Sequence, residues 1–164
     1  MAIPTPSAVA ASKRYIAPGT RKFVWVVTIA NKNAPTSAEI TAGKDLSSEV
    51  NDASGWTVTT NNVDTPDFGN RFTTKVPGMI TADDSSFTFY NDRLGVDIRT
   101  LLLRDVSGFV CVFPEGIAAG LTLDVFPVTI SSVPKQQSAS DPAHIVVNFA
   151  ITGVPAENVA VPTV

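Results

Sequence analysis

The residues able to carry out catalysis are few and lie apart in the sequence. The single histidine, His144, follows Asp141 by three positions, so one interpretation is a carboxylate–imidazole pair that transfers protons. A single histidine at the start of a strand is more often hydrated or hydrogen-bonded, and we favour that structural role. The sequence has no H-x-x-x-H, C-x-x-C, Walker-type or G-x-G-x-x-G motif. We therefore predict that the chain is not an enzyme and has no catalytic residue and no cofactor site.

Two groups of aspartates offer the oxygen ligands that hard cations prefer, namely Asp83 with Asp84 and Asp64 with Asp67. Both groups lie in turn-forming sequences, where aspartate side chains commonly accept local backbone hydrogen bonds. The single cysteine, Cys111, lies in the apolar run 109–113 and is typical of a buried structural thiol. One cysteine also excludes a disulfide within the chain. We predict no metal site and an unreactive thiol.

Charge divides the chain into a basic start and an acidic remainder. The first 38 residues contain no acidic residue, whereas the remaining 126 contain seven basic and fifteen acidic residues. A basic arm can bind nucleic acid or reach the acidic body of a second copy. We favour the second copy, because the cluster is small and lacks the interleaved aromatic residues of single-strand binders. The basic residues of the arm and first strand are Lys13, Arg14, Arg21, Lys22 and Lys32.

The length of 164 residues fits one domain. We assign 1–20, which holds three prolines, to an extended N-terminal arm, 21–154 to a single β-rich domain, and 155–164 to a C-terminal tail. The N-terminus has neither the charged leader nor the apolar core of a signal peptide. No run approaches the ~20 apolar residues of a membrane span. We therefore expect a protein that is made in a cytosol and does not insert into a membrane.

Alternation of apolar and polar residues predicts most of the domain to be strands. In the segment 121–133 the apolar face changes at Pro127, which predicts a bulge or bend there. The long connection 31–55, with a short helix or turn at 37–42, exceeds the usual length of a loop and is predicted to be functional. The predicted strands are 22–30, 56–60, 71–76 resuming at 79–81, 87–90, 109–113, 121–133 and 145–152.

A single longer helix is predicted after Asn91 or Asp92, either of which can cap it. The apolar residues that follow at helical spacing are Leu94, Ile98, Leu101 and Leu102. The fold class that we expect is mainly β, a β-sandwich or partly open barrel of six to seven strands with one flanking α-helix.

Short landmarks follow one another in a fixed order over residues 30–161, in a pattern similar to one known family. They are Ile29-Ala30-Asn31, Ala34-Pro35-Thr36, Ala38-Glu39-Ile40, Gly43, Asp45, Leu46, Gly55-Trp56-Thr57-Val58, Phe72-Thr73-Thr74, Val76-Pro77-Gly78, Asp84-Ser85-Ser86, the run 87–90, Asp97-Ile98-Arg99, Gly108-Phe109-Val110, the run 124–128 and Phe149-Ala150-Ile151. In this joint order the chain resembles the major tail tube proteins of long-tailed, siphovirus-type bacteriophages, particularly those of actinobacteria. The arm before Arg21 is outside the resemblance.

The resemblance implies a structural subunit whose copies form hexameric rings, and whose rings stack into a tube that delivers DNA. It implies further copies of the chain, a tape-measure protein and tail-terminator or tail-tip proteins as partners. It also implies transient, non-specific passage of DNA and a place in the virion tail after assembly in the host cytoplasm. From the family's stacking loop we carry inter-ring contact over to Pro35, Glu39, Ile40, Asp45 and Leu46. Arm contacts are assigned to Arg14, Tyr15 and Val161.

Three alternatives remain at this point. A head decoration or head–tail joining protein would form caps or single rings. The inner tube of a contractile system is a closer variant of the same function. A secreted β-sandwich that binds carbohydrate or protein is disfavoured, because the chain has neither a signal peptide nor a disulfide pair.

Overall fold

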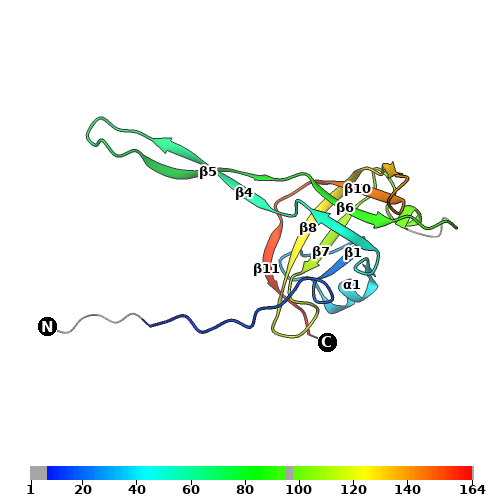
Figure 1. Ribbon diagram of the computed structural model, residues 1–164. Helices are drawn as coiled ribbons and strands as arrows, with labels where there is room; N and C mark the ends of the chain where they lie inside the picture. Colours follow the sequence, from blue (N-terminus) through cyan, green and yellow to red (C-terminus); the bar gives the residue numbers. More distant parts are fainter. Residues whose placement is uncertain (1–6, 95–97, 164) are drawn as a thin grey trace.

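The structure is a computed structural model that describes residues 7–94 and 98–163. Its body is one curled antiparallel sheet, from which a two-stranded hairpin projects (Figure 1). The predicted fold class is confirmed: the chain is mainly β, with antiparallel strands and one short α-helix in the described residues. The strands are β1 (Lys22–Val26), β2 (Lys44–Asp45), β3 (Val50–Ser54), β4 (Val58–Thr65), β5 (Thr74–Ala82), β6 (Ser85–Tyr90), β7 (Ser107–Phe113), β8 (Thr122–Ser132), β9 (Lys135–Gln136), β10 (His144–Ile151) and β11 (Ala156–Ala160); the helices are α1 (Ser37–Ala42) and the 3-10 turn η1 (Ile98–Thr100).

The main sheet has the order β2-β1-β7-β8-β10-β6-β3, with β11 added to β8 and β9 added to β10. Three strands separate β1 from β6 in this order, yet the rings of Phe23 in β1 and Phe87 in β6 lie 4.9 Å apart. The sheet therefore curls around its own apolar face, as a partly open barrel does. Among the described residues no helix has the length and apolar character needed to cross a membrane.

The concave face of the sheet encloses an inner core of aromatic and branched side chains. Trp56 stacks on Phe87 with ring centroids 4.6 Å apart, and Phe149 lies 5.4 Å from the same ring. Alternate residues of β6 and β10 supply this core, as the period of two in their sequences predicts. The buried members are Phe23, Trp25, Leu46, Trp56, Phe87, Phe89, Leu102, Val110, Val112, Phe126, Val128, Ile130, Ile145, Val147 and Phe149.

A second, outer core lies on the convex face of β1, β7 and β8. It explains why these strands are apolar at consecutive positions: each buries one face in the inner core and the other in the outer core. In β8, Leu123 and Val125 belong to the outer core, whereas Phe126 and Val128 belong to the inner one. The residues of the outer core are Val24, Val26, Ile29, Cys111, Phe113, Leu123, Val125, Ala156 and Val161.

The bulge predicted at Pro127 is wrong. The ladder between β7 and β8 runs from Ser107↔Thr129 to Val112↔Asp124 without a register shift. The irregularity in β8 lies nearer its end, opposite the step from Asn148 to Phe149 in β10. Pro127 is tolerated because its carbonyl, which accepts from the Thr152 N–H at 2.9 Å, points away from β7. Its nitrogen points the same way, toward the junction where the neighbour of β8 changes from β11 to β10.

The helix predicted after Asn91 is also wrong. Only the 3-10 turn η1 forms there among the described residues; residues 95–97 of that prediction lie outside them. Leu94 is 85% exposed, while Leu102 is buried and Leu101 packs on the inner core. Apolar residues spaced three or four apart therefore cover the end of the barrel from an irregular segment. The short helix expected at 37–42 is present as α1.

Several strand limits differ from the predicted ones. The first strand ends at Val26, and Val27 is 65% exposed because the chain turns out of the sheet there. The long connection 31–55 contains α1, β2 and β3, and residues 156–160 add β11 to the main sheet. The strand expected at 71–76 begins at Thr74 and runs on to Ala82 as β5. The described residues thus contain eleven strands, more than the six or seven expected.

Candidate assembly surface

The hairpin of β4 and β5 stands away from the body (Figure 1). Its ladder extends from Val58↔Ala82 to Thr65↔Thr74, and it forms a sheet of its own. An isolated two-stranded hairpin has marginal stability in water. In this hairpin the two strands pair only with each other among the described strands.

The hairpin is aligned by cross-strand polar pairs. Lys75 forms an ion pair with Asp64, and the hydroxyls of Thr65 and Thr74 lie 2.7 Å apart. A register shift between Thr60 and Asn62 brings Gly78 close to the opposite strand. A Cβ atom at Gly78 would lie 2.7 Å from the Asn61 carbonyl oxygen, so this position of the bulge requires glycine.

Apolar side chains are exposed along most of the hairpin. Val63 and Val76 face each other across the strands, and both are about half exposed. Phe68 is fully exposed and Phe72 is 72% exposed in the connection between the strands. Large apolar side chains that are exposed close together often mark an interaction site. The exposed apolar residues of the hairpin are Val63, Phe68, Phe72, Val76, Met79 and Ile80.

The base of the hairpin is fixed to the inner core. Gly55 and Trp56 both have left-handed backbone conformations, with φ of 81° and 55°. A Cβ at Gly55 would lie 2.5 Å from the Asp84 carbonyl oxygen. The Trp56 N–H donates to Ser85 Oγ at 3.0 Å, and its buried indole anchors the turn. The hairpin is therefore held at its root while its outer part is exposed.

The five residues assigned to inter-ring contact all have contacts within the chain. Pro35 and Leu46 are buried, and Ile40 packs against the outer core. Glu39 completes a capping box with Thr36 at the start of α1 and also accepts from the Ala30 N–H at 2.7 Å. The hydrogen bonds from the Ala30 and Thr36 backbone, with that from the Thr36 hydroxyl, lower the pKa of Glu39. The inter-ring role of these five residues stays a prediction.

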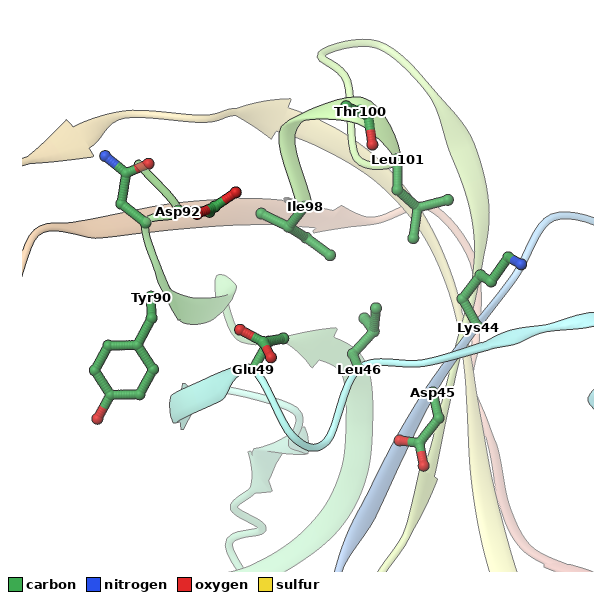
Figure 2. Close-up of a pocket in the computed structure, with 10 residues that line it drawn as sticks. Lys44, Asp45, Leu46, Glu49, Tyr90, Asp92, Ile98, Thr100 and Leu101 are labelled. Carbon is green, nitrogen blue, oxygen red and sulfur yellow. The ribbon is translucent and has the colours of Figure 1, made fainter. Parts of the chain in front are cut away.

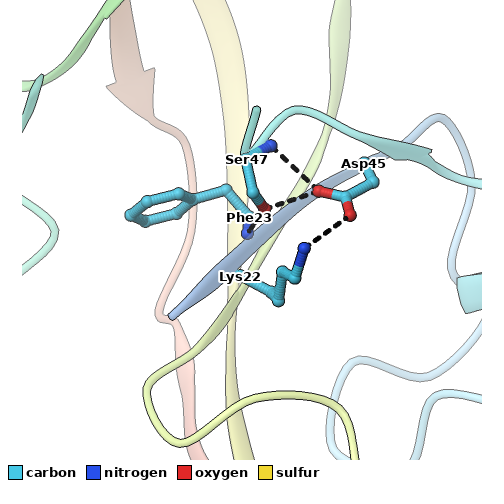
Figure 3. A network of polar contacts seen from close by, with 4 residues as sticks. All are labelled: Lys22, Phe23, Asp45 and Ser47. Carbon is cyan, nitrogen blue, oxygen red and sulfur yellow. Dashed lines mark hydrogen bonds and ion pairs between the residues drawn. The ribbon is translucent and has the colours of Figure 1, made fainter. Parts of the chain in front are cut away.

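Asp45, the fifth of these residues, joins β2 to β1 through a small polar network (Figure 3). Its carboxylate accepts from the Ser47 N–H at 2.9 Å and pairs with Lys22 Nζ at 3.3 Å. Ser47 Oγ in turn accepts from the Phe23 N–H at 2.9 Å. Partial burial by itself raises the pKa of Asp45, but the bonds from Ser47 and the charge of Lys22 outweigh it, so the pKa is lowered.

The residues assigned to arm contacts do not lie together. Arg14 and Tyr15 are exposed in the arm, which extends from the body (Figure 1). Val161 is 7% exposed in the outer core, and its N–H donates to the Leu121 carbonyl at 3.0 Å. The structure therefore gives Val161 an internal packing role and leaves Arg14 and Tyr15 on the surface.

The residues first considered for catalysis or metal binding contact groups of the chain close to them. The ring of His144 lies against Tyr90, with centroids 5.3 Å apart. Asp83 accepts from the Thr57 hydroxyl at 2.6 Å, and Asp67 accepts from the Gly69 N–H at 2.8 Å. Within residues 7–94 and 98–163, no three His, Cys, Asp or Glu side chains gather as a metal site would require.

Cys111 is fully buried in the outer core. Burial, with a smaller contribution from the charge of Glu39, raises the pKa of its thiol to about 12. The thiolate is the reactive form of cysteine, so this thiol is inert in the folded chain.

The projection of this hairpin from the body is a feature that the sequence pattern does not predict. Phe72, Thr74 and Val76 alternate with polar residues, which predicts a half-buried strand, yet Phe72 and Val76 are exposed. The signal available was the paucity of apolar residues in the facing strand, where Val58 and Val63 are the only two in 58–65. A facing strand with so few apolar residues cannot bury the side chains of Phe72 and Val76.

The described residues thus form a curled antiparallel barrel with an anchored hairpin that exposes apolar side chains. The chain belongs to the phage tail tube protein family, whose family model matches residues 9–164. Its family and fold are those of structural proteins of phage tails, and it is a component of the virion tail.

The solved structures with similar folds include two tail-terminating proteins. One is the sheath/tube terminator of PVC, an extracellular contractile injection system, in its extended state: the TM-score is 0.58 at 11% identity, over 85% of this chain and 94% of that one. The other is the tube-terminating cap of the anti-feeding prophage, with a TM-score of 0.50 at 11% identity, over 95% of this chain and 97% of that one. At this identity the likeness concerns the fold alone. No curated protein matches the sequence.

Proposed function

We propose that this chain is the tube-forming subunit of a siphovirus-type tail, whose copies assemble into hexameric rings that stack into a conduit for DNA. The observation that carries the proposal is the β4–β5 hairpin, which is anchored at Trp56 and exposes six apolar side chains. Burial of such side chains against another copy is favourable, at about 25 cal/mol for each Å² of apolar surface.

The projection of the hairpin from the body supports a stacked assembly (Figure 1). A hairpin that reaches a different surface of the next copy makes a heterologous contact, and heterologous contacts that do not close generate filaments. The main sheet also ends in two strands, β2 and β3, that each pair with one neighbour only among the described strands. Unpaired edges are a template for pairing with another chain, and closure of a ring would cover them.

The charge of the chain suits a channel for DNA. Binding of DNA strengthens with each phosphate that a basic side chain neutralises, whereas a conduit must release DNA. The formal net charge is −3, so a tube of many copies carries net negative charge. In this proposal DNA passes transiently and non-specifically, and the tube meets a tape-measure protein and terminator or tip proteins during assembly in the host cytoplasm.

Two alternative functions differ in the assembly that they would form. Because the two solved structures described above are a terminator and a cap, a subunit that forms one closed ring is the second candidate. Head–tail joining and decoration proteins would behave alike. The inner tube of a contractile system is a variant of the proposal and would give the same tubes.

Negative-stain microscopy of the purified chain at rising concentration, with light scattering alongside, tests the proposal. We expect hollow tubes or hexameric rings. A variant with Phe68→Ser, Phe72→Ser and Met79→Ser should remain folded and monomeric, because these side chains are exposed in the free chain. Ile117→Ser, a half-exposed residue outside the hairpin, is the matched control and should assemble. Closed rings that never stack would favour the terminator, and assembly of the triple variant would contradict the role of the hairpin.

A further inference from the structure

A groove opens beside the short strand β2, between the segment that follows it and the segment after β6. Its volume is about 760 Å³. Figure 2 shows Leu46 and Glu49 on one side, with Ile98 and Leu101 pointing toward them from the other. The remaining lining residues are Lys44, Asp45, Tyr90, Asn91, Asp92 and Thr100.

The groove combines an apolar floor with an acidic rim. Leu46 is 3% exposed, and Ile98 and Leu101 pack on the inner core beside it. Glu49 and Asp92 place carboxylates on the rim beside the ammonium of Lys44, while the carboxylate of Asp45 is paired with Lys22. Such a site suits an extended segment that carries positive charge next to apolar side chains.

One buried polar atom also lacks a partner in this groove. The Oδ1 atom of Asn91 is inaccessible to solvent and accepts no hydrogen bond from any residue in the described ranges. A buried acceptor without a donor costs free energy. Asn91 lines the groove, so this oxygen is a candidate acceptor for a donor that enters it.

The N-terminal arm has the matching chemistry. Within 7–20, Lys13 and Arg14 carry positive charge and are followed by the apolar Tyr15 and Ile16, with no acidic residue. Tyr15 is 53% and Ile16 76% exposed, although both are large apolar side chains. A guanidinium offers five donors, which suits a carboxylate and an amide oxygen at once.

The arm and the groove of one chain lie on different sides of the body. Figure 1 shows the arm running away from the body on the side opposite the segment that follows β6. The arm therefore reaches the groove of a second copy more readily than its own groove.

We propose that this groove binds the N-terminal arm of a second copy of the chain, with Arg14 on Glu49 and with Tyr15 and Ile16 on Leu46, Ile98 and Leu101. The inference rests on the proposed self-assembly and names one of its contacts. It requires neither a ring of six copies nor passage of DNA.

Cysteine cross-linking between two single variants tests the contact. Ser12→Cys lies in the arm and Ser48→Cys beside Glu49, and both positions are exposed. Native Cys111 does not interfere, because it is fully buried. When a size-tagged Ser12→Cys chain is mixed with Ser48→Cys, we expect a mixed disulfide of the two chains. Thr41→Cys, exposed on α1, is the control partner and should form none.

A peptide of residues 7–20, titrated into the full chain, tests the groove without requiring tubes. We expect one peptide to bind per chain, and Glu49→Lys to weaken binding about tenfold, as loss of a charge pair at an interface does. A peptide with Arg14→Glu should bind the Glu49→Lys chain more tightly than the native peptide does.

The two assays separate this inference from the proposed function. Tubes that form with neither the Ser12–Ser48 cross-link nor peptide binding would overturn the inference and leave the tube function standing. Peptide binding and cross-linking without tubes would support the inference and count against the tube.

Cross-linking to Thr41→Cys instead would place the arm elsewhere. A disulfide within one chain of the Ser12→Cys/Ser48→Cys double variant would show that the arm covers its own groove. Either result contradicts the proposal.

Discussion

At the scale of single residues, polar side chains in this chain tie local segments together. Asp45 is the clearest case, because its carboxylate joins Ser47 and Lys22 and so holds β2 beside the start of β1 (Figure 3). The side chain is half exposed, which limits the free energy that the network supplies. Its effect should still be visible in the dependence of stability on pH.

We predict that Asp45→Asn destabilises the chain at pH 7 by roughly 0.5 kcal/mol, the range of partly exposed ion pairs. The pKa of Asp45 is lower in the folded chain than its ordinary value of 3.8. A lowered folded pKa contributes stability above the unfolded value, and this contribution is lost as the pH falls through the folded one. Urea unfolding at pH 7 and pH 3 should show the difference between wild type and variant shrinking at pH 3. Asp52→Asn, an exposed carboxylate in β3, is the control; a difference that stays constant with pH would contradict the assignment.

At the scale of elements, short segments here depend on caps and anchors. The helix α1 has six residues, too few to be stable alone, and the capping box of Thr36 and Glu39 holds its start. The hairpin is similarly fixed by Gly55 and Trp56 at its root. Each element keeps its place through a few named contacts with the body.

Removal of the cap should therefore lower the stability of the whole domain. We predict that Thr36→Ala lowers the free energy of unfolding by about 1 kcal/mol, the usual cost of losing an N-cap. Thr36→Ser keeps the hydroxyl that accepts from the Glu39 N–H at 3.3 Å and should cost much less. Chemical unfolding followed by tryptophan fluorescence measures both variants; equal stability of the two would show that the cap contributes nothing.

At the scale of the whole molecule, the outer core is completed from both ends of the domain. Val161, close to the C-terminus, packs with Val24 of β1 and with Cys111 in one cluster. Because Val161 and Cys111 belong to the same buried cluster, we expect the reactivity of the thiol to depend on the packing of the C-terminal segment.

We predict that Val161→Ser costs roughly 2 kcal/mol, close to the loss of one buried valine, and speeds modification of Cys111 by a thiol reagent at pH 8. In the intact chain the thiol has a pKa of about 12 and is buried, so it should react only after unfolding. Val154→Ser changes a valine that is 64% exposed and should leave both stability and reactivity unchanged. Fast labelling of the wild-type thiol would contradict the packing of this segment.

The sequence by itself determined those elements whose side chains alternate against one core. In β10, Ile145, Val147 and Phe149 follow a period of two and are all buried, and Phe87 and Phe89 do the same in β6. The capped turn that starts α1 could also be predicted, because a capping box depends only on residues three apart. The tail tube resemblance, carried by the order of short landmarks, is confirmed by the family match.

Only the tertiary structure decided which strands have two buried faces and which have none. In the sequence of β8, the change of apolar face at Pro127 suggests a bulge. In the structure the ladder is unbroken, and the change arises because the strand packs against two cores on its opposite sides. The predictions of a helix after Asn91 and of a half-buried strand around Phe72 are wrong for a related reason. Burial depends on what the rest of the chain, or another copy, places against a segment, and periodicity cannot specify that partner.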